Sequence, residues 1–248
     1  HMQVAPTGDV SLCCVHSTAT PPLGNVKRQT LKDIWNSPRM REIRLNMLEG
    51  KPSPECARCY ETEGNGMNSS LRLIHTQRFE HHMPLVSRTE SDGSVETLNM
   101  PYMDVRFSNI CNFRCRSCGP EYSSNWYDDA VRSGENVNGI TRIMHADDHR
   151  GVLWDQIEDL IPNVEVIYFA GGEPLLMEEH YRILNLLIER KRFDVAIQYN
   201  TNFSQLRYKD QDVLALWSHF QNVQVGASLD HIGRKGEYAR KGFDWQTF

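Results

Sequence analysis

Three cysteines in one short run carry the clearest chemical signal in this sequence. Cys111, Cys115 and Cys118 follow a strand-like stretch with C-x3-C-x2-C spacing. A closed tetrahedral metal site takes four ligands, so three neighbouring thiolates leave one coordination position open. Thiolates select zinc, copper(I) or iron–sulfur clusters, and electron-transfer clusters normally have four cysteine ligands. The run therefore predicts a cluster that binds a small molecule at an iron without a cysteine ligand. A zinc knot or three core cysteines are the alternatives.

A second set of candidate binding residues follows the later predicted strands. Ligands of parallel α/β sheets bind at the carboxyl ends of the strands, and all of these residues occur there. Two adjacent glycines allow close backbone approach to a ligand, although alone they equally suit an ordinary tight turn. The residues after the last strand equally suit a helix cap. The set comprises Gly171, Gly172, Glu173, Pro174, Asn202, Ser228 and Asp230.

The elements that must position these residues form a regular α/β pattern from residue 102 onward. Alternating strands and helices indicate βαβ units and a parallel sheet. About four units fit, fewer than the eight of a complete barrel, so we expect a partial β/α barrel. The segment 133–150 has little periodicity and is either a loop near the site or an insertion. We expect strands over 103–110, 164–170, 195–199 and 223–229, and helices over 122–131, 152–160, 180–191 and 211–220.

The first hundred residues predict a small α+β unit, which places a domain boundary between 1–100 and 101–248. Strands over 2–5 and 10–13 flank a turn-forming segment. Helix starts are expected at Thr30, where Asp33 completes a capping box, and at Ser37-Pro38. A further helix is expected over 70–81. The segment 91–94 has the composition of a hairpin tip between two strands.

The cysteine run, followed by Gly171-Gly172-Glu173-Pro174 after the next strand, resembles the radical S-adenosylmethionine (radical SAM) superfamily. The resemblance covers residues from about 102 to the end. It implies a partial or full β/α barrel, a [4Fe–4S] cluster on the three cysteines, and S-adenosylmethionine chelating the fourth iron through its amine and carboxylate.

The same resemblance assigns expected roles to individual residues. Gly171, Gly172 and Glu173 would hold the methionyl amino group. Asn202, Ser228 and Asp230 resemble polar contacts to ribose and methionine, and Arg240 resembles an arginine that meets the carboxylate. Ser117 departs from the family pattern, which usually has an aromatic residue before the last cysteine.

The N-terminal unit is similar to the SPASM/twitch class of auxiliary-cluster domains. The similarity lies in Cys13-Cys14, Gly24-Asn25, Leu31-x2-Ile34-Trp35 and Cys56-x2-Cys59. It implies a second [4Fe–4S] cluster, with a zinc site as the alternative. Such a domain usually follows the radical SAM domain, whereas here it precedes it. Neighbouring residues in a strand point to opposite faces, so we expect only one of the adjacent cysteine pair to be a ligand.

Composition limits the partners and the compartment. The formal net charge of −5 gives no electrostatic case for a nucleic-acid partner, and no apolar run is long enough to span a membrane. Five of the seven cysteines have spacings that suit metal sites better than disulfides, which predicts a reducing, cytoplasmic setting. The chain begins at His1 and ends without a helix stop signal, so we expect a fragment cut at both ends, with the part 101–248 incomplete at its C-terminus.

These observations predict a radical SAM enzyme that cleaves S-adenosylmethionine reductively to a 5′-deoxyadenosyl radical. The resemblance implies a peptide or protein side chain as substrate, with a small molecule left open, and an external electron donor such as ferredoxin or flavodoxin. The alternatives are a non-catalytic iron–sulfur electron carrier and a zinc-stabilised interaction module.

Other aromatic and imidazole side chains are interpreted as structural. Adjacent His81 and His82 are expected on the surface of a helix, facing different directions. Four tryptophans occur among apolar helix positions and are expected in the core. They are Trp35, Trp126, Trp154 and Trp217.

Overall fold

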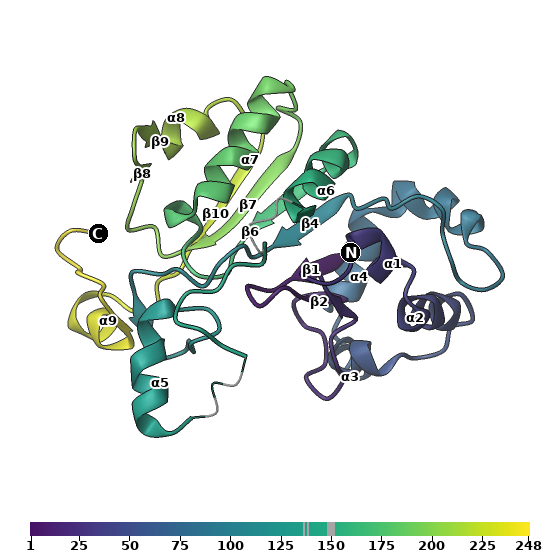
Figure 1. Cartoon of the computed structure of the whole chain (residues 1–248), viewed down its shortest axis with the longest axis horizontal. Coiled ribbons are helices and arrows are strands. Elements are labelled where there is room, and N and C mark those ends of the chain that lie inside the picture. The colour runs from purple at the N-terminus through teal and green to yellow at the C-terminus, as the bar shows by residue number, and fades with distance from the viewer. Residues whose placement is uncertain (136, 138, 148–151) are drawn as a thin grey trace.

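A seven-stranded sheet organises the computed structural model, which describes residues 1–135, 137, 139–147 and 152–248 (Figure 1). Neighbouring strands are parallel from β10 to β1, and β1, β2 and β3 are antiparallel. The fold is therefore α/β, as predicted, while closure into a barrel stays a prediction. The strand order is β10 (Val223–Ala227), β7 (Ala196–Thr201), β6 (Val166–Phe169), β4 (Tyr102–Val105), β1 (Met2–Val4), β2 (Asp9–Ser11) and β3 (Gly24–Asn25).

The two predicted parts of the chain share this sheet. β1 pairs with β4 in parallel register, with Val4 opposite Val105. One hydrophobic core extends from β1 to Ile167 of β6 and Ile197 of β7. Each fully buried aliphatic side chain of this kind contributes roughly 1.5–3 kcal/mol. The sheet thus crosses the boundary predicted at residue 100, and the division into 1–100 and 101–248 stays a prediction.

The helices of the α/β part connect the parallel strands. α6 (Val152–Leu160) and α7 (Glu178–Glu189) contribute Ile157 and Leu184 to the core, because each buries one apolar side. In Figure 1, α5 and α9 lie at the opposite end of the molecule from α1, α2 and α3. The remaining elements are α5 (Tyr127–Ser133), β8 (Arg207–Tyr208), β9 (Gln211–Asp212), α8 (Val213–Trp217), α9 (Gly233–Ala239), and the short pair β5 (Arg114–Cys115) and β11 (Arg240–Lys241).

The N-terminal helices begin where their caps predict. The Thr30 hydroxyl and the Asp33 side chain form a reciprocal capping box at α1, and Ser37 caps α2, which begins at Pro38. Ser70 caps α4 in the same way. These elements are α1 (Leu31–Trp35), α2 (Pro38–Leu48), the 3₁₀ helix η1 (Pro54–Cys56), α3 (Ala57–Gly64), α4 (Leu71–Arg78) and the 3₁₀ helix η2 (Glu80–Arg88).

The hairpin predicted around residues 91–94 is wrong. Gly93 has a φ of +81° and the segment does turn, but the residues before it form η2 rather than a strand. Pro84 lies inside η2. Proline has no N–H to donate to a ladder, so this segment is a poor strand.

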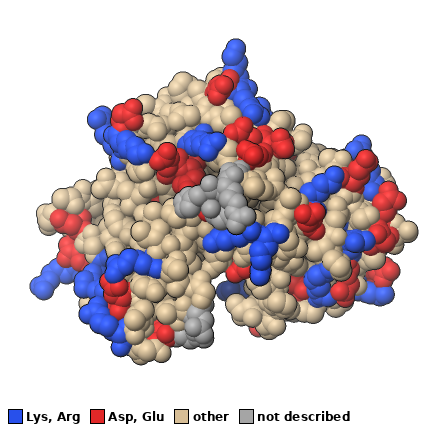
Figure 2. Space-filling model, in the orientation of Figure 1, with Lys and Arg blue, Asp and Glu red and all other residues tan. Residues whose placement is uncertain are grey.

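The surface carries charges of both signs. Figure 2 shows acidic and basic side chains interspersed over the face in view. None of the described helices combines the length and apolar character that crossing a bilayer requires.

Candidate iron–sulfur and ligand-binding sites

The cysteine loop opens into a cavity of about 310 Å³ at the carboxyl ends of the parallel strands. Cys111, Cys115 and Cys118 all line it, from the loop that follows β4. Most of the candidate ligand residues predicted from the sequence lie in the same wall. Those residues are Gly171, Gly172, Glu173, Asn202, Ser228 and Arg240, while Pro174 and Asp230 lie outside the lining.

Side chains from outside the cysteine run hold the loop in shape. Asn109 is completely buried and bridges two segments: its Nδ2 donates to the Pro120 carbonyl (2.9 Å), and its Oδ1 accepts from the Met144 amide (2.8 Å). The Trp126 indole donates to the Cys115 carbonyl (2.8 Å). Trp126, predicted as core, thus positions a candidate ligand.

Burial disfavours the charged form of all three thiols. Burial, with a smaller effect from Glu173 and from the other two cysteines of the loop, raises the pKa of Cys111 to about 12. Burial also raises the pKa of Cys115 and Cys118. A metal cation would lower these pKa values and hold the thiolates. The donor set therefore fits a cationic, sulfur-binding centre.

Hydrogen-bond donors face the sulfur atoms. Asn202 Nδ2 lies 3.9 Å from the Cys111 sulfur, and the Phe113 amide lies 3.4 Å from the same atom. Arg240 Nη1 lies 3.5 Å from the Cys115 sulfur. Such donors stabilise the negative charge that cluster thiolates carry, and they tune the cluster potential.

The diglycine turn lies directly against the cysteine loop. A Cβ added at Gly172 would lie 2.1 Å from the Ile110 carbonyl oxygen, a severe overlap. Gly171 has a φ of +116°, a conformation that favours glycine. The Glu173 amide donates to the Ile110 carbonyl (2.7 Å). The glycines are therefore required by packing against the candidate cluster loop, which an isolated tight turn would not need.

Glu173 joins the ends of two parallel strands. Its carboxylate accepts hydrogen bonds from Thr201 Oγ1 (2.5 Å), the Asn202 amide (2.7 Å) and the Leu175 amide (3.1 Å). The side chain is 1% exposed. Burial raises the pKa of Glu173, although these donors oppose the shift. Its contact with a methionyl amino group stays a prediction.

We expect Thr201→Val to destabilise the fold by about 2 kcal/mol, because it removes two buried hydrogen bonds at roughly 1 kcal/mol each. The hydroxyl donates to Glu173 and accepts from the Phe203 amide (2.9 Å). Urea unfolding would measure the change. Thr62→Val is the matched control, since that exposed hydroxyl contacts only its own helix through the Arg58 carbonyl. Equal stability of the two variants would contradict the anchoring role.

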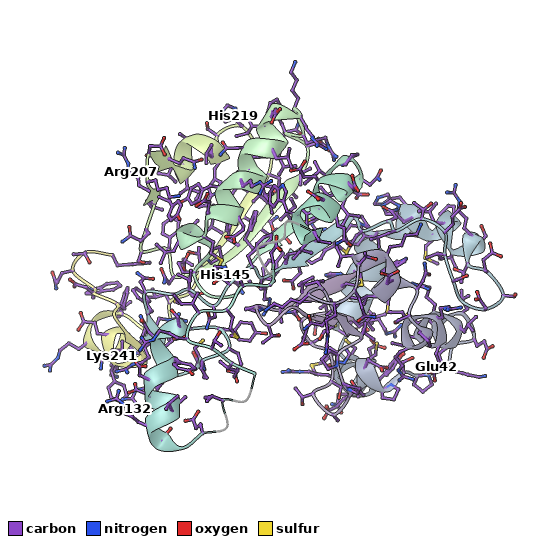
Figure 3. The ribbon with its side chains drawn as sticks, viewed as in Figure 1. Glu42, Arg132, His145, Arg207, His219 and Lys241 are labelled. Atoms are coloured by element: carbon purple, nitrogen blue, oxygen red, sulfur yellow. The ribbon has the colours of Figure 1, made fainter. Side chains whose placement is uncertain are left out.

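Arg240 is held at the cavity by Asp230. Its Nε lies 2.8 Å from Asp230 Oδ2, and its side chain is only 13% exposed. β11 pairs with β5, which puts Arg240 opposite Cys115. Lys241, the next residue of β11, is labelled in Figure 3 beside α9. Asp230 thus acts on the cavity through Arg240, whereas Ser228 lines it directly and donates its amide to the Thr201 carbonyl (2.7 Å).

Arg106 is a cavity residue that the sequence reasoning missed. It lines the cavity, and its guanidinium forms an ion pair with Asp104 (3.2 Å), which is 1% exposed. Asp104 lies between Met103 and Val105 in β4, so an acid inside an otherwise apolar strand was the available signal. A buried acid with a paired arginine brings one cation to the same wall as Gly171.

Three cysteines of the N-terminal unit line a second cavity, of about 370 Å³. They are Cys13, Cys56 and Cys59, and Cys14 is exposed and lies outside this lining. Burial raises the pKa of Cys13 to about 12 and that of Cys56 to about 11. The geometry therefore favours Cys13 over Cys14 as the member of the pair that faces the cavity.

An ion pair fixes the turn that carries Cys56. Glu55, with a side chain 2% exposed, pairs with Arg39 of α2 through two oxygens (2.6 and 2.9 Å). Burial alone would raise the pKa of Glu55, but the hydrogen bonds from Arg39 and the backbone lower it overall. The charged carboxylate is thus favoured in the folded state.

The lowered pKa of Glu55 predicts that the fold loses stability as the solution becomes acidic. A carboxyl with a lowered pKa in the folded state stabilises the fold above about pH 4.5, and this contribution is lost as pH falls through the folded pKa. We expect the free energy of unfolding to fall more steeply between pH 5 and about 3 in the wild type than in Glu55→Gln. Urea titrations at each pH would measure it. The exposed Glu61→Gln is the control. Equal slopes for the wild type and Glu55→Gln would contradict the prediction.

Comparison with known families supports the second site. Residues 1–60 match the model of SPASM, an iron–sulfur cluster-binding domain. The match covers 60 of the 248 residues and includes all four N-terminal cysteines. Comparison with curated proteins and with solved structures gave no match. The match indicates iron–sulfur cluster binding by this protein.

Proposed function

We propose that the protein is a radical SAM enzyme with an auxiliary iron–sulfur cluster. The observation that carries the proposal is one cavity lined by Cys111, Cys115 and Cys118 together with Gly171 and Gly172. Three thiols without a fourth in the lining suit a cluster with one free coordination position. SPASM domains occur in radical SAM enzymes, so the N-terminal match supports the same class.

The residues that line the cavity of the cysteine loop fit the cluster and the cofactor that this proposal implies. Cys111, Cys115 and Cys118 would hold a [4Fe–4S] cluster, and the polar groups that line the same cavity would hold S-adenosylmethionine. When bound, the reduced cluster supplies one electron that breaks a carbon–sulfur bond of S-adenosylmethionine, giving methionine and a 5′-deoxyadenosyl radical that abstracts hydrogen from substrate.

The protein contributes positioning, charge and exclusion of water. Arg240 and Arg106, each oriented by a paired carboxylate, bring guanidinium hydrogen-bond donors to the cavity lining, which suits a ligand carboxylate. Asn202 reaches both the Cys111 sulfur and Asn112 Oδ1 (2.8 Å), so it fixes the loop relative to β7. Phe113 and Phe243 pack against the cysteines and keep water from one side of the centre.

The N-terminal cavity would hold the auxiliary cluster through Cys13, Cys56 and Cys59. We further propose a peptide or protein side chain as the substrate class and a small external electron donor such as ferredoxin or flavodoxin. The substrate proposal rests on the class of enzyme, since many enzymes with auxiliary clusters modify peptides.

Anaerobic reconstitution followed by iron and sulfide analysis tests the proposal. Two cubane clusters give about eight irons per chain. We expect the dithionite-reduced protein to convert S-adenosylmethionine to 5′-deoxyadenosine, measured by liquid chromatography with mass spectrometry. A chain with about eight irons and no 5′-deoxyadenosine would instead be an electron carrier. A colourless protein that retains zinc through reconstitution would be an interaction module.

A further inference from the structure

His81, His82 and Glu165 form a compact cluster away from both cysteine sites. One ligand atom from each lies within 4.8 Å of the other two. His81 Nε2 lies 3.0 Å from both carboxylate oxygens of Glu165, and His82 Nε2 lies 2.5 Å from one of them. The expectation that the two imidazoles face different directions is wrong, because both turn to one carboxylate.

The rings of His81 and His82 lie close together within η2. Ring centroids of His81 and His82 are 4.3 Å apart, and Phe79 lies about equally far from both (6.3 and 6.4 Å). The His82 amide donates to the Phe79 carbonyl (2.9 Å), which holds the turn. Glu165 is fixed by the sheet: its amide donates to Pro101 (2.8 Å) and its carbonyl accepts from Ala196 (2.9 Å).

We propose that these three side chains bind a divalent first-row transition metal, with Zn²⁺ as the matching ion. Two imidazoles and one carboxylate are borderline ligands that suit zinc and its neighbours. Ligand atoms about 2.0 Å from a tetrahedral zinc lie about 3.3 Å apart. Here each imidazole Nε2 lies 2.5–3.0 Å from a Glu165 oxygen, and the three ligand atoms all lie within 4.8 Å of one another. Three protein ligands leave one position for water.

The electrostatic surroundings are compatible with a cation. Arg192 interacts with Glu165, but its guanidinium is neutralised by Asp194 (2.9 Å) and also donates to the Val164 carbonyl (2.7 Å). The Glu165 side chain is 36% exposed and that of His82 is 28% exposed, so an ion can enter from solvent without opening the core.

The position of the cluster defines its role. Glu165 immediately precedes β6, at the amino end of the parallel strands, whereas the cavity of the cysteine loop follows the carboxyl end of β6. A metal here would not touch the reacting atoms. It would tie η2 of the N-terminal part to the start of a central strand.

Zinc binding to the cluster-reconstituted protein is the test. With its cysteines occupied by iron–sulfur clusters, we expect the wild type to take up about one Zn²⁺ per chain at this site. His82→Ala and Glu165→Gln should each weaken zinc binding by more than about 100-fold. Loss of a residue that only hydrogen-bonds a metal ligand weakens binding by about 10- to 100-fold, and loss of the ligand itself should weaken it more. His219→Ala is the matched control; this exposed histidine is labelled in Figure 3, and its ring stacks on Phe193.

Two readouts separate this site from the cysteines and from misfolding. Zinc X-ray absorption should show only nitrogen and oxygen neighbours at about 2.0–2.1 Å, without sulfur at about 2.3 Å. Zinc should raise the melting temperature of the wild type and of His219→Ala, but not that of His81→Ala. Because the His81 side chain is exposed, His81→Ala should have the same melting temperature as the wild type when no metal is present. Sulfur neighbours around the zinc, unchanged zinc affinity in His82→Ala and Glu165→Gln, or no zinc uptake would overturn the proposal. The three side chains would then be only an ion pair between the histidines and Glu165.

Discussion

Cys115→Ala is expected to lower the iron content from about eight to about four per chain and to reduce 5′-deoxyadenosine formation below about 1% of the wild type. Cys115 lies in β5, which pairs with β11, and its sulfur lines the cavity 3.5 Å from Arg240 Nη1, so the fold holds this thiol at the proposed cluster. Iron analysis and product analysis on the same sample measure both effects.

Cys14→Ala is the matched control for this experiment. The Cys14 thiol is exposed and lies outside the linings of both cysteine cavities. Its removal should leave about eight irons and normal cleavage of S-adenosylmethionine. If Cys115→Ala kept the full iron content and activity, the cavity could not hold the catalytic cluster and the proposed function would be wrong.

Gly172→Ala is expected to destabilise the protein by about 3 kcal/mol, at the upper end for overpacking. The added methyl would lie 2.1 Å from the Ile110 carbonyl oxygen and 2.8 Å from the Asn109 carbonyl carbon. Both are backbone atoms of the segment that leads into Cys111, so relief of the overlap must shift the loop. A displacement of about 1 Å at a catalytic centre reduces turnover roughly 100-fold, and we expect that loss in 5′-deoxyadenosine formation.

Gly64→Ala provides the comparison for Gly172→Ala. Gly64 ends α3 with nothing within 4 Å of an added Cβ. Alanine there should be neutral or stabilise by up to about 1 kcal/mol through helix propensity. Urea unfolding and product analysis on both variants would measure the difference. Similar behaviour of the two variants would show that the turn does not press on the cysteine loop.

The local features of the fold were predictable because they depend on neighbours in sequence. The capping box at Thr30 and the cap at Ser37 fixed two helix starts, and α6 has the predicted bounds. Apolar runs predicted the four parallel strands after residue 100, β4, β6, β7 and β10, near their observed positions. The predicted strand from 103 was too long, because it ends at Val105 before the cysteine loop.

Features that depend on distant pairing could not be predicted. Nothing in the segment 2–4 indicates that β1 pairs in parallel with β4, almost a hundred residues later. The hairpin around Gly93 failed because turn composition says where a chain reverses, not whether its flanks form strands. The loop 133–150 includes residues outside the described ranges, so its prediction is not tested there.

The sequence by itself determined the ligand chemistry: three thiols spaced for one loop, two glycines before a carboxylate, and four more cysteines near the start. The cysteine run and the Gly171-Gly172-Glu173 turn are short-range patterns, and spacing along the chain suffices to bring the members of each together. Only the tertiary structure decided that Arg240 faces Cys115, that Glu173 is held by Thr201, and that two histidines share Glu165. Those contacts join residues 28 to 125 positions apart, and packing of the whole sheet sets them.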